Sequence, residues 1–325
     1  MTFRIDRSRK GLILLVCLWL LVVGGVAAVA PGVLQASVAI SVLQFSSMLA
    51  LVALGQALLI ISGAGVDLSV GGMVSLTAIL TMIAVRRGMP PEAIPFAAVL
   101  IGSLLGAVNG LLVVGFRLLS LIATLGTMFV YGGLAVALTR GATAPGVPAW
   151  LLPWGRDQIG GLPYHTLTAV VPAFLIGQAV LGLSSWGRWI LAMGNNERSA
   201  RLVGIPVDRA RFLLYSASGT LAGVAALVSL AWFGAGRPDV GQNLELESLA
   251  AVLLGGVSIV GGGGGVLGVL AAVLLIVTLQ TALQFINVSS VWQTGAVGLL
   301  LILVLLTDLV PLGASRARSR APAGN

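Results

Sequence analysis

Residues 43–62 read LQFSSMLALVALGQALLIIS, a run of twenty residues without a charged side chain. At a helical rise of about 1.5 Å per residue, such a run crosses the hydrocarbon core of a bilayer, which is about 30 Å thick. Similar apolar blocks recur along the chain, so that 58% of its residues are hydrophobic and only 9% are charged. A soluble domain carries about a quarter charged residues. The sequence therefore predicts an all-α membrane protein.

Ten such blocks can be placed, and the connectors between them leave no room for a second domain. The expected spans lie near residues 11–30, 43–62, 69–85, 94–116, 118–139, 164–184, 211–232, 247–260, 265–286 and 291–310. The third and the eighth are short for a full crossing, and short segments in transporters can be broken helices that line the pathway. We therefore predict about ten transmembrane helices in a single transmembrane domain, residues 11–310.

Basic residues at both ends of this domain indicate its orientation. The basic segment 1–10 and the apolar run behind it imitate a signal peptide, but the run exceeds the usual length of about 7–15 residues, so we expect a retained first span. With the N-terminus inside, cytoplasmic segments hold thirteen of the eighteen Lys and Arg residues, Arg211 among them, and the pair Arg86 and Arg87 is the main argument against this topology. We expect both termini, including the basic tail 311–325, in the cytoplasm. We interpret the net charge of +8 as loop charge that sets orientation and not as affinity for nucleic acid.

Residues for catalysis or metal binding are scarce. Cys17 and His165 are the only residues of their kinds, so no Cys–His pair or metal cluster can form, and His165, in a polar connector, is expected at the surface. Lys10 is the only lysine, which rules out a Walker A loop. Residues 263–268 fit a dinucleotide fingerprint, but the next acidic residue, Asp308, is too far away, and we expect a turn between spans. The sequence predicts a protein that is not an enzyme and binds no metal or cofactor itself.

Glycine stripes predict a close contact between helices. Gly102, Gly106 and Gly110 repeat every four residues on one helical face, and Gly219 and Gly223 do the same on another. Small residues at this spacing let two backbones approach closely in lipid. We interpret both stripes as packing surfaces.

A few polar residues interrupt the apolar spans and are candidates for a substrate path. Asp67 and Ser69 lie at a break between two spans, and Asn109, Thr124 and Thr127 lie inside otherwise apolar segments. A carboxylate near hydrocarbon is costly, so Asp67 is expected to face a cavity, a helix terminus or a partner. It can either brace the backbone where the next span begins or contact a transported solute. For Asn109 and the two threonines, the alternative to a path is hydrogen bonding between helices.

Five motifs occur in an order that resembles the permease subunits of ribose-type bacterial ABC importers. In that family the first motif reads close to GGIDLSVG, and this chain has Ala64 where the family usually has Gly. The resemblance covers residues 40–310. The five motifs are Ser62–Gly72, Asn109–Gly110, Ala123–Thr127, Gly194–Ile205 and Ala250–Gly256, the last of which precedes Gly261–Gly265.

The fourth motif also has a physical interpretation of its own. Its charged and apolar residues can form a short amphipathic helix that docks in a groove of a partner. The resemblance implies that this loop is the coupling helix that meets the ATPase subunit; the alternative is a solvated loop with ordinary positive-inside charge. The candidate coupling residues are Asn195, Asn196, Glu197, Arg198, Ala200, Arg201, Gly204 and Ile205.

The resemblance also implies a set of partners. It implies a second permease copy or a paralogue, a cytoplasmic ABC ATPase that carries the ATP and Mg, and a periplasmic sugar-binding protein. Mixed charges in the outer loop before the eighth span are candidates for docking that binding protein through rim charge pairs. These residues are Arg237, Asp239, Glu245 and Glu247, although a solvated loop would carry the same charges.

Together these features predict a membrane-spanning permease subunit in the inner membrane of a bacterium. The expected cargo is a monosaccharide or similar small polyol, and the alternative within the family is the signal molecule autoinducer-2. An ion-coupled secondary transporter is a rival of another class, but it would usually need more buried ionisable residues than Asp67 and Asp308. An intramembrane enzyme is a third possibility, and the missing His and Cys partners argue against it.

Overall fold

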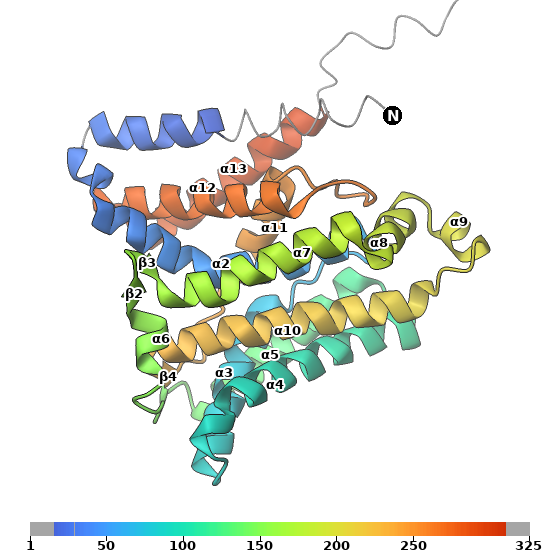
Figure 1. The fold of residues 1–325 in the computed structure, drawn as a ribbon, viewed down its shortest axis with the longest axis horizontal. Helices are drawn as coiled ribbons and strands as arrows, with labels where there is room; N and C mark the ends of the chain where they lie inside the picture. The colour runs from blue at the N-terminus through green and yellow to red at the C-terminus, as the bar shows by residue number, and fades with distance from the viewer. Residues whose placement is uncertain (1–15, 29, 310–325) are drawn as a thin grey trace, which may run out of the picture.

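Helices form nearly all of the structure, a computed structural model that describes residues 16–28 and 30–309 (Figure 1). The expected basic segments 1–10 and 311–325 lie outside these residues. The long helices follow the predicted spans, and the first of them covers Val16–Ala28. The others are α2 Ala36–Ile61, α3 Val70–Arg86, α4 Ile94–Gly110, α5 Ser120–Thr139, α7 Val171–Leu183, α10 Val207–Phe233, α11 Leu244–Leu254, α12 Val266–Phe285 and α13 Ser290–Leu309.

Short elements extend or join these helices. Single π-helical turns continue α4 and precede α7. The short elements are Pro31–Leu34, Pro91–Ala93, Leu111–Gly115, Thr166–Val170, α6 Leu152–Arg156, α8 Ser185–Asn195, α9 Glu197–Leu202, β1 Ala144–Pro145, β2 Gln158–Ile159, β3 Leu162–Pro163 and β4 Ala235–Gly236.

The structure confirms a polytopic α-helical membrane protein. Within the described residues, six helices are long and apolar enough to cross a membrane: Ala36–Ile61, Pro91–Gly115, Ser120–Thr139, Thr166–Leu183, Val207–Phe233 and Val266–Phe285. The predicted third span is α3, which at 17 residues is short, as expected. The predicted eighth span, 247–260, is wrong at its C-terminal end, because α11 stops at Leu254 and Gly256 follows with a left-handed φ of 82°.

The glycine stripes meet where α10 crosses α4. A Cβ atom on Gly106 would lie 2.9 Å from the Cα of Gly219, and one on Gly102 would lie 2.7 Å from the Cα of Gly223. Real Cβ atoms do not approach that closely, so the backbones can touch only because these positions lack side chains. The predicted packing role of both stripes is confirmed.

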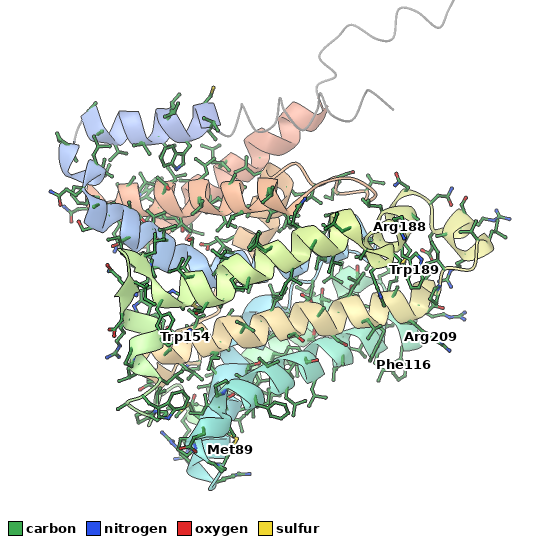
Figure 2. All side chains as sticks on the ribbon, in the orientation of Figure 1. Met89, Phe116, Trp154, Arg188, Trp189 and Arg209 are labelled. Carbon is green, nitrogen blue, oxygen red and sulfur yellow. The ribbon has the colours of Figure 1, made fainter. Side chains whose placement is uncertain are left out.

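The two ends of the bundle differ. One end carries the short strands: β1 pairs antiparallel with β4, and β2 pairs with β3 across a turn in which Gly160 and Gly161 both have positive φ. Two-residue hairpins favour glycine for this reason. The other end carries α8 and α9. Arg188 and Arg209 lie at this α9 end, whereas Trp154 lies at the strand end (Figure 2).

His165 does not lie at the surface. Its side chain is fully buried beside Trp154, with ring centroids 6.2 Å apart in an edge-to-face arrangement. The prediction of a surface histidine was wrong because the polar connector 140–163 folds back over the helix ends, which places the residue immediately before Thr166–Val170 in the interior.

Candidate functional site

The site begins at the break between α2 and α3. Gly63 and Gly65 have φ values of 70° and 101°, which L side chains rarely adopt. A Cβ atom on Gly65 would also overlap the Ser120 hydroxyl. These two glycines let the chain leave α2 and turn back into the bundle before α3 starts, which places the following residues in the protein interior.

Asp67 lies at the centre of a buried hydrogen-bond network. Its Oδ1 atom accepts from the backbone N–H and the hydroxyl of Ser69, at 2.9 and 2.7 Å, and its Oδ2 atom accepts from Asn109 Nδ2 at 3.5 Å. Asn109 Nδ2 also donates to Ser69 Oγ at 2.6 Å. All three side chains are fully buried. The carboxylate thus holds the turn that leads into α3 and ties it to α4.

Two further side chains hold the backbone of the break. The N–H of Asp67 donates to Gln56 Oε1 at 3.3 Å, and the N–H of Leu68 donates to Thr124 Oγ1 at 3.1 Å. Tyr131 donates to Leu105 O at 3.0 Å and lies 3.4 Å from Asn109 Oδ1. Residues from α2, α4 and α5 therefore converge on one buried segment.

Four of the five predicted path residues come together here, and the fifth does not. Thr127 hydrogen-bonds only to Thr124 O of its own helix among the described residues. The prediction missed Gln56 and Tyr131. Gln56 is the only amide within the otherwise apolar half of α2 that precedes the break, and that isolation in the sequence could have pointed to it. Its Nε2 atom is buried and has no hydrogen-bond partner among the described residues.

The second candidate region is the segment around α9. Asn196 caps this helix by accepting from the N–H of Ser199 at 2.9 Å. The predicted short amphipathic helix is α9, which follows the end of α8 at Asn195 and stops at Leu202, before Ile205. Ala200 and Ile205 face inward onto a small cluster, whereas Leu202 is 82% exposed. Gly204, with a φ of 84°, follows the C-terminal end of α9. Arg198 lies on α9 and forms no ion pair among the described residues.

Charges of α9 form a network with the start of α10. The Nη2 atom of Arg201 lies 2.9 Å from Oε1 of Glu197 and 2.5 Å from Oδ1 of Asp208. Partial burial raises the pKa of Glu197, but hydrogen bonds from Arg211 and Arg201 outweigh it, so the net pKa is lowered. The Glu197 carboxylate is therefore held in the ionised form.

This network reaches the buried break. Arg211 donates to Glu197 Oε2 at 2.5 Å and to Gly63 O at 3.3 Å, and one turn further along α10 the Tyr215 hydroxyl donates to Ala64 O at 3.1 Å. Two side chains of α10 thus hold consecutive carbonyl groups of the segment that leads to Asp67. The sequence prediction placed Arg211 among the cytoplasmic charges but gave it no role.

A glycine junction joins the same regions. The N–H of Gly262 donates to Ile61 O at 2.8 Å, and Asn195 Nδ2 donates to Gly262 O at 3.2 Å. Gly194 packs against both partners, since a Cβ atom there would overlap Ile61 O. The glycine run 261–265 is therefore a tight turn that packs on the end of α2.

The predicted docking residues separate into two groups. Arg237 and Asp239 form an exposed ion pair of 2.9 Å at the strand end. Glu245 and Glu247 were expected in a loop, but they lie in the first turn of α11. Glu245 lies against Gly71 at the start of α3, and Glu247 accepts from Gln280. The prediction missed this because α11 begins before the apolar block does.

These features define a class of protein, a polytopic membrane protein with a break between two of its helices. Hydrogen bonds link the charged segment around α9, at one end of the bundle, to the buried polar groups at this break. Among the described residues, no three His, Cys, Asp or Glu side chains are placed to hold a metal ion. A broken helix that leads to buried polar groups is typical of a transport protein.

Comparison with known proteins gives the family. Residues 38–305 match the family described as the permease component of the branched-chain amino acid transport system, and the chain belongs to that family. It is 35% identical over 270 residues to a probable ABC transporter permease, y4mJ, of Sinorhizobium fredii, covering 82% of this chain and 80% of that protein. No solved structure matches the chain significantly.

Two other relatives carry names that state a solute. The ribose import permease of Bacillus subtilis is 34% identical over 260 residues, covering 79% of this chain and 80% of that protein. An autoinducer 2 import system permease of Yersinia pseudotuberculosis is 34% identical over 284 residues, covering 84% of each. The predicted resemblance to this group of permeases is confirmed.

Proposed function

We propose that this chain is the membrane-spanning subunit of an ATP-driven importer that carries a monosaccharide or similar small polyol across a bacterial inner membrane. The observation that carries the proposal is its similarity to the ribose import permease over four-fifths of each chain. In this proposal the chain has ten spans and both termini in the cytoplasm, so the α9 end would face the cytoplasm and the strand end would face outward.

The nature of the buried polar groups supports a neutral solute. Apart from Asp67, the groups around the break are amides and hydroxyls, which donate and accept hydrogen bonds without fixed charge. Because the Asp67 carboxylate is occupied by Ser69 and Asn109, it presents little free charge to a solute.

The partners follow from this role. A cytoplasmic ATPase, which binds ATP and Mg, would contact the segment from Asn195 to Ile205. The apolar side chains of Leu202 and Val203 are exposed there, and the ATPase would bury them. A periplasmic sugar-binding protein would meet the strand end, where Arg237 and Asp239 are exposed. A second permease copy or a paralogue would complete the pair. Nucleotide hydrolysis would shift the populations of inward-facing and outward-facing states.

Reconstitution tests the proposal. The chain is purified with the ATPase and the binding protein encoded by neighbouring genes, placed in vesicles, and supplied with labelled ribose. We expect accumulation that requires both ATP and the binding protein. Accumulation by the chain alone, driven by an ion gradient, would overturn the proposal in favour of a secondary transporter.

Autoinducer-2 is the second candidate solute, because the Yersinia relative is named for its import. Competition decides between the two. Labelled ribose uptake is measured with unlabelled autoinducer-2, ribose, or xylose in excess. The solute that suppresses uptake at the lowest concentration is the preferred cargo.

A further inference from the structure

A polar cleft lies at the strand end, away from the buried break. It consists of two adjoining cavities of about 390 and 310 Å³. Both are lined by Phe45 of α2 and by Thr281 and Gln284 of α12, so they lie side by side. Ligand pockets for small molecules have volumes of about 300–1,000 Å³. Each part of the cleft is therefore large enough for a solute the size of a monosaccharide.

The helix faces that line the cleft carry polar side chains. The first twelve residues of α12, 266–277, are all apolar or glycine, whereas its last turns contain Gln280, Thr281 and Gln284. These three side chains lie at spacings that place them on one helical face, and all three line the cleft. Polar groups within membrane helices face the bundle interior or a water-filled cavity, because lipid cannot satisfy them.

The neighbouring helices repeat this pattern. Ser290, Gln293 and Thr294 share one face in the first turns of α13, and all three line the same cavity. On α11, Asn243 and Glu247 line it from the other side. Three separate segments thus turn amides, hydroxyls and one carboxylate toward one space.

Hydrogen bonds fix part of the lining and leave other groups for a ligand. Gln280 Nε2 donates to Glu247 Oε1 at 2.7 Å, and Gln293 Nε2 donates to Val288 O at 2.8 Å. Among the residues that the structure describes, no Lys or Arg lines either cavity. The lining therefore offers neutral donors and acceptors with a single carboxylate, which suits hydroxyl groups better than anions.

Phe45 gives the cleft an apolar surface. Its side chain is 46% exposed and lines both cavities, and its ring is held by Trp232 at a centroid distance of 5.0 Å. A fixed aromatic ring among polar groups is the usual composition of a small-molecule site. The ring can cover the apolar face of a sugar while the amides bind its hydroxyls.

We propose that this cleft between α2, α11, α12 and α13 is a binding site for a neutral polyhydroxylated solute on its way into the permease. The proposal rests on the proposed function and adds to it a location within one subunit. In this site Glu247, which accepts a hydrogen bond from Gln280, contacts the solute. It therefore does not dock the binding protein.

Cysteine labelling tests the site, since Cys17 is the only cysteine and Cys17→Ser gives a background without thiols. Thr281→Cys is introduced in the cleft, and Glu92→Cys in the exposed turn Pro91–Ala93 is the matched control. The complex with its ATPase and binding protein is treated with a charged methanethiosulfonate reagent. We expect modification at position 281 to abolish most ribose uptake, and modification at position 92 to leave it unchanged.

A second measurement does not depend on transport. The rate of maleimide labelling of Thr281→Cys is followed as ribose is titrated, with betaine as the osmotic control. Because occupancy slows labelling by a factor of 1 + [L]/Kd, ribose at about ten times its Kd slows it about tenfold. Labelling that ribose leaves unchanged, together with normal uptake after modification, overturns the proposal.

The outcomes separate this proposal from the proposed function. If the wild type imports ribose, and the modified Thr281→Cys variant also imports it and is labelled at a rate that ribose does not change, the cleft is rejected but the importer is kept. Absent wild-type uptake with protected labelling removes the ATP-driven function for ribose but keeps the site. A cleft filled by lipid gives a third result, in which Thr281→Cys reacts with neither reagent, and this also rejects the site.

Discussion

The guanidinium of Arg211 lies 2.5 Å from the carboxylate of Glu197 and also donates to the carbonyl of Gly63. One side chain therefore joins α9, the candidate contact for the ATPase, to the backbone four residues before Asp67. Its side chain is only 19% exposed, so water competes weakly for these contacts. A displacement of α9 would move Gly63 directly.

Arg211→Gln is therefore expected to uncouple hydrolysis from transport. Hydrogen bonds to charged groups contribute about 1.5–3 kcal/mol, so we expect the amount of solute imported per ATP hydrolysed to fall by at least about tenfold. The measurement is uptake and phosphate release in the same vesicles. Arg209→Gln is the control, because Arg209 has no ion pair among the described residues. Equal losses in both variants would contradict a specific role for Arg211.

The exposed apolar tip of α9 gives a prediction about assembly. The side chains of Leu202 and Val203 are 82% and 77% exposed, although they are apolar and lie next to the charged network of α9. Leu202→Asp is expected to prevent co-purification of the ATPase, because a carboxylate would be buried in the partner's groove. Ile159→Asp is the matched control at the strand end, where Ile159 is 52% exposed. Retained co-purification with Leu202→Asp would place the ATPase contact elsewhere.

Acid is expected to loosen α9 only well below neutral pH. The pKa of Glu197 is lowered in the folded protein. Its stabilising contribution is therefore fully present above the ordinary carboxyl value of about 4, and is lost as the pH falls through the lower folded value. A spin label at Arg198→Cys in the Cys17→Ser background should stay immobile from neutral pH to about 5 and become mobile below about 4. Mobility that rises between neutral pH and 5 would show that another group controls the helix.

The role of Asp67 can be decided by separating folding from uptake. Asp67→Ala leaves the Ser69 N–H, the Ser69 hydroxyl and the Asn109 amide without their acceptor, and each buried unpaired group costs about 1–3 kcal/mol. A backbone brace predicts that thermal stability in detergent and uptake fall together. Thr127→Val is the control and should change neither, since Thr127 bonds only within its helix. Asp67→Asn with unchanged stability and lost uptake would instead support a direct contact with the solute.

The sequence could predict what depends on local pattern. Apolar blocks located the helices, because a helix in lipid must be apolar along its whole crossing. Spacing alone also predicted that Gly102 and Gly219 lie in packing surfaces, although not that they meet. The site was partly predictable, since isolated polar residues such as Asp67 and Asn109 are costly in a membrane and therefore conspicuous.

The rest depended on contacts between distant segments. His165 looked exposed because its neighbours in sequence are polar, but the fold of the connector buries it. Glu247 looked like a loop residue because the apolar block starts after it, whereas Gln280 of α12 holds it inside. Arg211 looked like an orientation signal, and only its distance to Gly63 gives it another role. No local pattern contains such pairings.

The crossing of α4 and α10 gives a last prediction, which concerns stability. Gly106→Ala would bring a methyl group to 2.9 Å from the Cα of Gly219, and the rigid backbone of α10 has to move to admit it. Overpacking of this kind costs about 1–3 kcal/mol. Gly133→Ala is the matched control, because nothing within the chain lies within 4 Å of a Cβ atom there. In an exposed helix interior alanine is favoured over glycine by about 1 kcal/mol. We expect Gly106→Ala to lower the melting temperature in detergent and Gly133→Ala to leave it unchanged or raise it. If the purified pair of subunits is destabilised by Gly133→Ala as strongly as by Gly106→Ala, the open face of α5 is covered by a neighbouring chain, and the crossing of α4 and α10 is not the more sensitive contact.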